Sequence, residues 1–170
     1  MENEGVKEIT MGSIMKRLGT ILKNTPPLGL LLSVIYLACV SILKWKLDPP
    51  VDAAWFLAGG IAGIYFLDFA DEFFRLHPSP FRTILFAGLF ALLSLFIVTS
   101  SQSYAAIGLV LATYLMFLYL LVIEWKKSGT IDRWCRMIGG PVPRSIQTQM
   151  LIGFFILFLI ETYVFLRSHL

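Results

Sequence analysis

Glu161 is the residue whose position most invites a chemical interpretation. It lies inside an apolar run over residues 148–167, with apolar neighbours on both sides. An ionisable group within a membrane is costly, so it is expected to bind a proton or to pair with a group that reaches in, such as Lys44. We favour a hydrogen bond that ties helices together, which is common in membrane bundles. A proton-binding or ligand-binding role is the alternative.

A second group of ionisable residues consists of Asp68, Asp71, Glu72 and Arg75. Their spacing of i, i+3, i+4 and i+7 places them on one face of a helix. For Asp71 and Glu72 we favour a solvated helix end with Arg75 as a neutralising partner, because charge at a membrane interface costs little. Asp68 is the deepest of these carboxylates. A cation or proton site, a polar contact to a partner and a solvated helix end all remain open for it.

Other patterns that would indicate an enzyme or a metal centre are absent from the sequence. Cys39 and Cys135 fall in different segments, and His77 and His169 are far apart, so neither pair indicates a ligand set. The chain has no HExxH, G-x-S-x-G, P-loop or Rossmann motif. We therefore name no catalytic residue, metal or cofactor, and we favour a role that is not enzymatic.

The segments that must position these residues are five long apolar runs. Hydrophobic residues make up 57% of the 170 residues, against about 45–50% in soluble domains. Crossing a hydrocarbon core takes about 20 helical residues, and only a helix satisfies its own backbone there. The sequence therefore predicts an all-α polytopic membrane protein, with a cytoplasmic tail over 1–26 and one five-helix membrane domain over 27–170. The predicted spans are about 27–45, 51–70, 81–100, 103–124 and 148–167.

Lysine and arginine indicate how these helices cross the membrane. With the N-terminus in the cytoplasm, only Lys44, Lys46 and Arg167 of the 14 basic residues lie outside. Cytoplasmic loops of membrane proteins carry such an excess of basic residues. We therefore expect a protein of the cell membrane with a cytoplasmic N-terminus and an external C-terminus. The other eleven basic residues then lie in the cytoplasm: Lys7, Lys16, Arg17, Lys23, Arg75, Arg82, Lys126, Lys127, Arg133, Arg136 and Arg144.

Two further segments are expected to lie in the plane of the inner leaflet. Residues 8–24 carry apolar side chains at helical spacing with basic residues off that stripe, which is typical of an amphipathic helix at a membrane surface. A docking helix for a partner is the alternative. In the loop 125–147, Thr130 can cap a short helix in which Ile131, Trp134 and Ile138 share one face. We expect Trp134 at the inner interface, where indoles are enriched.

Arg133, Arg136 and Arg144 in this loop are candidates for contact with a phosphate or a lipid headgroup. The simpler interpretation is that they only set the topology, because the positive-inside rule predicts them without a ligand. The net charge of +3 does not indicate nucleic acid, since the basic residues flank apolar runs. The lipid bilayer is the expected partner.

Gly59 and Gly63 form a GxxxG pair in the second span, which permits close approach of two helices. We favour packing inside the bundle over a homodimer face.

Three functions fit the sequence. The first is a non-enzymatic scaffold or accessory subunit of a membrane complex, with a protein partner or a second copy. The second is a small transporter or proton-coupled carrier that uses Asp68 or Glu161, and the third is an enzyme acting on a lipid or lipid-linked substrate.

Overall fold

The computed structural model describes residues 19, 26–46, 50–74, 79–138 and 142–167. This part of the chain is all-helical, which confirms the predicted fold class. The amphipathic helix expected over 8–24 and the side chain of Arg75 lie outside the described residues. The helices are α2 (Pro27–Trp45), α3 (Val51–Phe74), α4 (Ile84–Ser100), α5 (Tyr104–Ser128) and α6 (Arg144–Arg167).

Four of these helices, α2, α3, α5 and α6, are long and apolar enough to cross a membrane. Helix α4 is a shorter apolar helix of 17 residues, which gives it a length of about 26 Å at 1.5 Å per residue. Hydroxyl side chains cap the N-termini of two of the helices. Thr83 accepts a hydrogen bond from the Phe86 amide at the start of α4, and Ser103 accepts one from the Ala106 amide at the start of α5.

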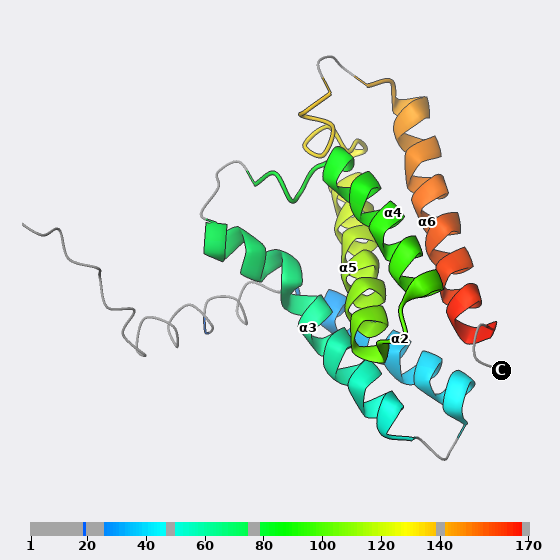
Figure 1. Ribbon diagram of the computed structural model, residues 1–170. Helices are drawn as coiled ribbons and strands as arrows, with labels where there is room; N and C mark the ends of the chain where they lie inside the picture. Colours follow the sequence, from blue (N-terminus) through cyan, green and yellow to red (C-terminus); the bar gives the residue numbers. More distant parts are fainter. Residues whose placement is uncertain (1–18, 20–25, 47–49, 75–78, 139–141, 168–170) are drawn as a thin grey trace, which may run out of the picture.

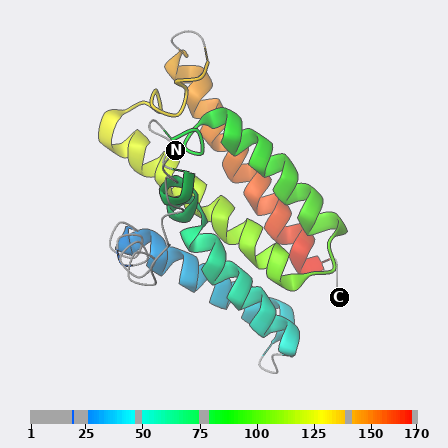
Figure 2. The same ribbon diagram turned by 60° about the vertical axis from the view of Figure 1, so that its left-hand side comes forward.

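Helix α5 lies at the centre of the bundle and contacts each of the other four helices (Figures 1 and 2). It is the most buried helix, with Tyr114, Phe117 and Leu111 enclosed on all sides. Helices α2, α4 and α6 instead expose many large apolar side chains. An apolar outer surface around a packed core suits a bundle surrounded by lipid.

The most extensive contact between helices joins α3 to α5, and glycine makes it close. A Cβ atom added to Gly59 would collide with the carbonyl oxygen of Ala105, and one added to Gly63 would collide with that of Leu109. Gly108 of α5 lies equally close to the Phe56 carbonyl oxygen. Gly59 and Gly63 therefore pack inside the bundle and are not available as the face of a homodimer.

The segment after α5 differs from the short in-plane helix that the sequence predicts. Residues 131–138, here named the turn segment, form successive turns in which Trp134 and Cys135 donate backbone hydrogen bonds to Ile131 and Ile138 donates one to Cys135. Ile131 and Trp134 are buried against the bundle, and the Trp134 carbonyl accepts a 2.8 Å hydrogen bond from the Ile84 amide at the start of α4. The prediction was wrong because this apolar face packs on protein and not on lipid.

Candidate functional site

Glu161 of α6 is fully buried, with none of its surface accessible. The Ser94 hydroxyl of α4 donates a 2.6 Å hydrogen bond to its Oε2 atom. Its other carboxyl oxygen, Oε1, has no hydrogen-bond partner among the described residues. This contact joins α4 to α6 across the bundle. The sequence alone did not identify Ser94, because a lone serine in an apolar run carries no periodic signal.

Side chains from α2 and α5 complete the surroundings of Glu161. The Tyr36 hydroxyl forms a 2.8 Å hydrogen bond with Thr162 Oγ1, and the Tyr114 hydroxyl donates a 3.0 Å hydrogen bond to the Phe154 carbonyl. Side chains of α2, α4 and α5 thus bind to α6 on either side of Glu161 and at its carboxyl.

Lys44 of α2 was the cation expected to reach toward Glu161. Its Nζ atom donates a 2.6 Å hydrogen bond to the Phe165 carbonyl and lies 4.0 Å from the centre of the Phe165 ring. The ammonium group therefore contacts α6 about one helical turn beyond Glu161. It joins the end of α2 to the end of α6.

Asp68 and Asp71 of α3 lie beside Arg82, which belongs to the segment before α4. The Arg82 guanidinium contacts Asp68 Oδ1 at 2.8 Å and Asp71 Oδ2 at 2.7 Å, and the Ser79 hydroxyl also donates to Asp71. One guanidinium therefore bridges two carboxylates on one helix face. The sequence indicated the shared face but not this partner. Glu72 is half-buried and takes part in no ion pair within the described part of the chain.

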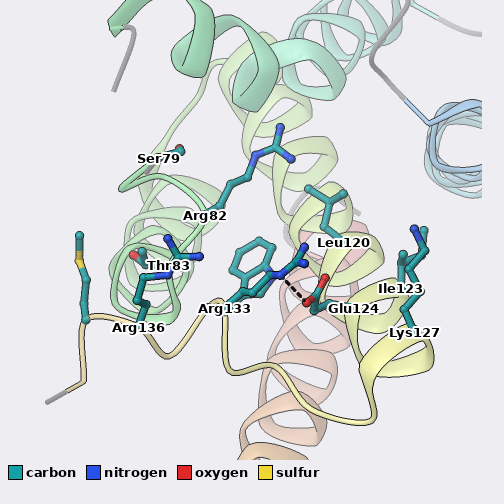
Figure 3. Close-up of a pocket in the computed structure, with 11 residues that line it drawn as sticks. Ser79, Arg82, Thr83, Leu120, Ile123, Glu124, Lys127, Arg133 and Arg136 are labelled. Atoms are coloured by element: carbon teal, nitrogen blue, oxygen red, sulfur yellow. Dashed lines mark ion pairs between the residues drawn. The ribbon is translucent and has the colours of Figure 1, made fainter. Parts of the chain in front are cut away.

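Two cavities open beside this cluster, at the end of the bundle where α5 ends and α4 and α6 begin. We name this end the basic end. The larger cavity, here the basic cavity, has a volume of about 410 Å³ and lies between the last turns of α5, the segment before α4 and the turn segment (Figure 3). The smaller one, of about 210 Å³, is lined in part by Asp68. Arg82, Leu120, Ile123 and Lys127 line both.

Four basic side chains line the basic cavity: Arg82, Lys127, Arg133 and Arg136. Among the described residues, the one carboxylate in its lining is Glu124, which lies 3.4 Å from the Arg133 guanidinium (Figure 3). Arg144, which was grouped with Arg133 and Arg136 as a headgroup candidate, is not in the lining. Its guanidinium instead lies 5.4 Å from the centre of the Trp125 ring.

Gln147 of α6 holds the turn segment in place. This side chain is buried, and its Oε1 atom accepts a 2.6 Å hydrogen bond from the Ile131 amide. Its Nε2 atom donates to Asp132 Oδ1 at 2.7 Å and to the Val142 carbonyl at 2.9 Å. Cys135 lies buried in the same segment, and burial, followed by the nearby Asp132 carboxylate, raises the pKa of the Cys135 thiol. Sequence reasoning did not identify Gln147.

The two polar regions are chemically distinct. The Glu161 carboxyl is enclosed by uncharged groups and lines neither cavity, whereas Asp68 and Asp71 are paired with a cation beside open space. No cluster of histidine, cysteine or carboxylate side chains suited to a metal ion occurs among the residues that the structure describes. No protein-family model, curated protein sequence or solved structure gives a significant match to this chain.

Proposed function

We propose that this multi-pass helical bundle is a non-enzymatic scaffold or accessory subunit of a membrane complex. The observation that carries the proposal is the Glu161–Ser94 contact: Glu161, the one fully buried carboxyl among the described residues, holds α6 to α4. Hydrogen bonds of this kind join helices in membrane bundles. Asp68 and Asp71 likewise form ion pairs with Arg82 that join α3 to the segment before α4. The polar groups thus serve assembly of the bundle.

The proposal includes insertion of all five helices, with the basic end in the cytoplasm. The nine described basic residues support this direction, because six lie at the basic end and only Lys44, Lys46 and Arg167 lie at the other end. Such an asymmetry is the usual mark of a cytoplasmic face. It gives a cytoplasmic N-terminus and an external C-terminus. Insertion of the shorter α4 is supported by its contacts with α5 and α6 on its inner side and by its exposed leucines on the outer side.

Purification from native membranes in a mild detergent tests the proposed role. Native mass spectrometry should show the 19.2 kDa chain at fixed stoichiometry with another protein or with a second copy. A preparation that holds only the single chain overturns the proposal. Gly88 on α4 and Gly153 on α6 have open space beside them, so Gly88→Leu and Gly153→Leu should leave the bundle folded. Loss of the complex in one variant and not in the other identifies the helix that holds the partner.

A carrier is the second candidate, because Asp68 lines the smaller cavity. Proton and cation flux into liposomes that contain the purified chain separates the two functions. A scaffold should give no flux above that of empty liposomes. Flux that disappears in Asp68→Asn but persists in Asp52→Asn, a matched change at the opposite end of α3, would establish the carrier instead.

A further inference from the structure

The basic cavity combines an excess of positive charge with an apolar wall. In the part of the chain that the structure describes, its lining holds four cationic side chains and the single carboxylate of Glu124. Topology alone requires basic residues near the cytoplasmic surface, but it does not require those of three separate segments to converge on one hollow. We propose that this cavity binds the phosphate of an anionic lipid headgroup.

Two of the cations keep their full capacity to donate hydrogen bonds. Within the described ranges, neither Lys127 nor Arg136 forms an ion pair or a side-chain hydrogen bond with protein. The pair between Arg133 and Glu124 is long, at 3.4 Å, and uses one of several guanidinium donors. A guanidinium fork matches the geometry of phosphate oxygens, and an ammonium adds a point charge. The lining of the cavity therefore offers an anion donor groups from both α5 and the turn segment.

The apolar wall selects a lipid over a free anion. Leu120 and Ile123 line both cavities, and the smaller cavity is also lined by Ile64, Leu67 and Met116. Inorganic phosphate gains nothing from such a surface. The glycerol and first acyl carbons of a phospholipid would cover it and leave the phosphate among the cations at the rim.

The cavity is also held in shape before any ligand arrives. Gln147 fixes the backbone of the turn segment through Ile131 and Val142, and the Trp134 carbonyl is bound to the first amide of α4. Preorganised donors bind with a smaller entropic cost than mobile ones. Arg133 and Arg136 are thus presented from a backbone that is anchored at both α4 and α6.

Native mass spectrometry of the full chain in detergent, titrated with phosphatidylglycerol and with phosphatidylcholine of the same acyl chains, tests this site. We expect tighter binding of phosphatidylglycerol, because only this lipid lacks a compensating cation. Lys127→Gln and Arg136→Gln should each weaken that binding by roughly fivefold, from about 1 kcal/mol per basic residue near an anionic surface. Equal binding of the two lipids overturns the proposal.

Lys126→Gln is the matched control, because Lys126 is the exposed neighbour of Lys127 on α5 and does not line the cavity. We expect this variant to bind phosphatidylglycerol like the unchanged chain. Equal losses in Lys126→Gln and Lys127→Gln would show general surface attraction and overturn the site. Inorganic phosphate in excess should not displace the lipid, and full displacement would overturn the assignment to a lipid. The inference needs an inserted bundle but no protein partner, so it can fail while the proposed function stands.

Discussion

Glu161 and the pair Asp68–Asp71 are carboxylates at different depths of one bundle, and their partners differ in kind. Glu161 is completely enclosed and receives a neutral serine hydroxyl. Asp68 and Asp71 keep side-chain exposures of 14% and 22% and share the guanidinium of Arg82, which is itself 41% exposed.

The difference follows from where each carboxyl lies relative to water. A cation carried deep into an apolar bundle costs several kcal/mol in lost hydration, and its attraction to a carboxylate does not reliably offset that cost. A hydroxyl costs less to bury and still satisfies one oxygen. At the end of the bundle both ions keep part of their hydration, so pairing a carboxylate with arginine has only a small desolvation cost. Depth thus decides whether a carboxylate receives a hydroxyl or a charge.

The largest difference between the two sites is expected when a charge of the opposite sign replaces each carboxylate. Glu161→Lys should lower the free energy of unfolding by about 3 kcal/mol or more, because the ammonium would be buried beside Ser94 without an anion. Asp71→Lys should cost about 1 kcal/mol, since the rim is partly hydrated and Arg82 keeps Asp68. Tryptophan fluorescence during thermal unfolding in detergent measures both. Equal losses would show that depth does not separate the two sites.

A second test uses Gln147, which is buried like Glu161 but satisfies both ends of its amide. Gln147→Leu leaves the Ile131 amide and the Val142 carbonyl without partners. This should destabilise the closed turn segment by about 2 kcal/mol. Opening of the turn segment should then expose Cys135 roughly thirtyfold more often, at tenfold per 1.4 kcal/mol. Maleimide labelling in a Cys39→Ser background measures the opening.

Gln149→Leu is the control for this experiment, because Gln149 is exposed two residues farther along the same helix. We expect its Cys135 labelling to match that of the unchanged chain. Because the pKa of the closed Cys135 thiol is raised, less thiolate is present at a given pH and slow labelling should persist to higher pH than for an ordinary thiol. Rapid labelling of Cys135 in the unchanged chain would contradict a closed turn segment.

The hydrogen bond between Ser94 and Glu161 should contribute a smaller, measurable coupling free energy. In a cycle of Ser94→Ala, Glu161→Met and the double variant, we expect a coupling free energy of about 1 kcal/mol, within the range measured for hydrogen bonds between membrane helices. Glu161→Gln should remain folded and nearly as stable as the unchanged chain, because its amide oxygen still accepts from Ser94. A coupling near zero would remove the structural role that supports the proposed function.

The smallest loss of stability is expected for the ion pair between Asp71 and Arg82, at the end of the bundle. Asp71→Asn should lower the free energy of unfolding by about 0.5 kcal/mol, since partly exposed ion pairs contribute little. This loss should shrink as salt concentration rises, because salt screens exposed charges much more than buried groups. Ser94→Ala measured over the same salt series should show no such change. If the loss caused by Asp71→Asn does not change with salt concentration, the ion pair of Asp71 with Arg82 is shielded from solvent ions, which would contradict its partial exposure.

The sequence predicted the helices well because crossing an apolar layer constrains each run locally. The expected first span over 27–45 coincides with α2, where Pro27 stands at the first position and loses no internal hydrogen bond. The other spans differ mainly at their ends, as for α5, which continues to Ser128 until Gly129 adopts a left-handed conformation. These errors arise where polar residues extend a helix beyond the apolar run.

The side-chain contacts could not be predicted, because they depend on how the helices are rotated and ordered in space. Glu161 stood out as an anomaly, but nothing in residues 81–100 marked Ser94 as its partner. Arg82 counted only as a topology residue, and its pairing with Asp68 spans 14 positions. In the loop, the sequence correctly predicted an apolar face that includes Ile131 and Trp134. It could not show whether lipid or protein would cover that face.

The glycine contact between α3 and α5 also constrains how the chain is made. Synthesis delivers α2, α3 and α4 to the membrane before α5 exists. Gly60 of α3 finds Leu37 of α2 at once, but the backbones that cover Gly59 and Gly63 arrive only with α5. Until then the glycine face of α3 is uncovered, and α4, which precedes α5 in the chain, must not come between the two helices. The core of this protein can therefore close only once α5 has been made, and not with the first helical hairpin.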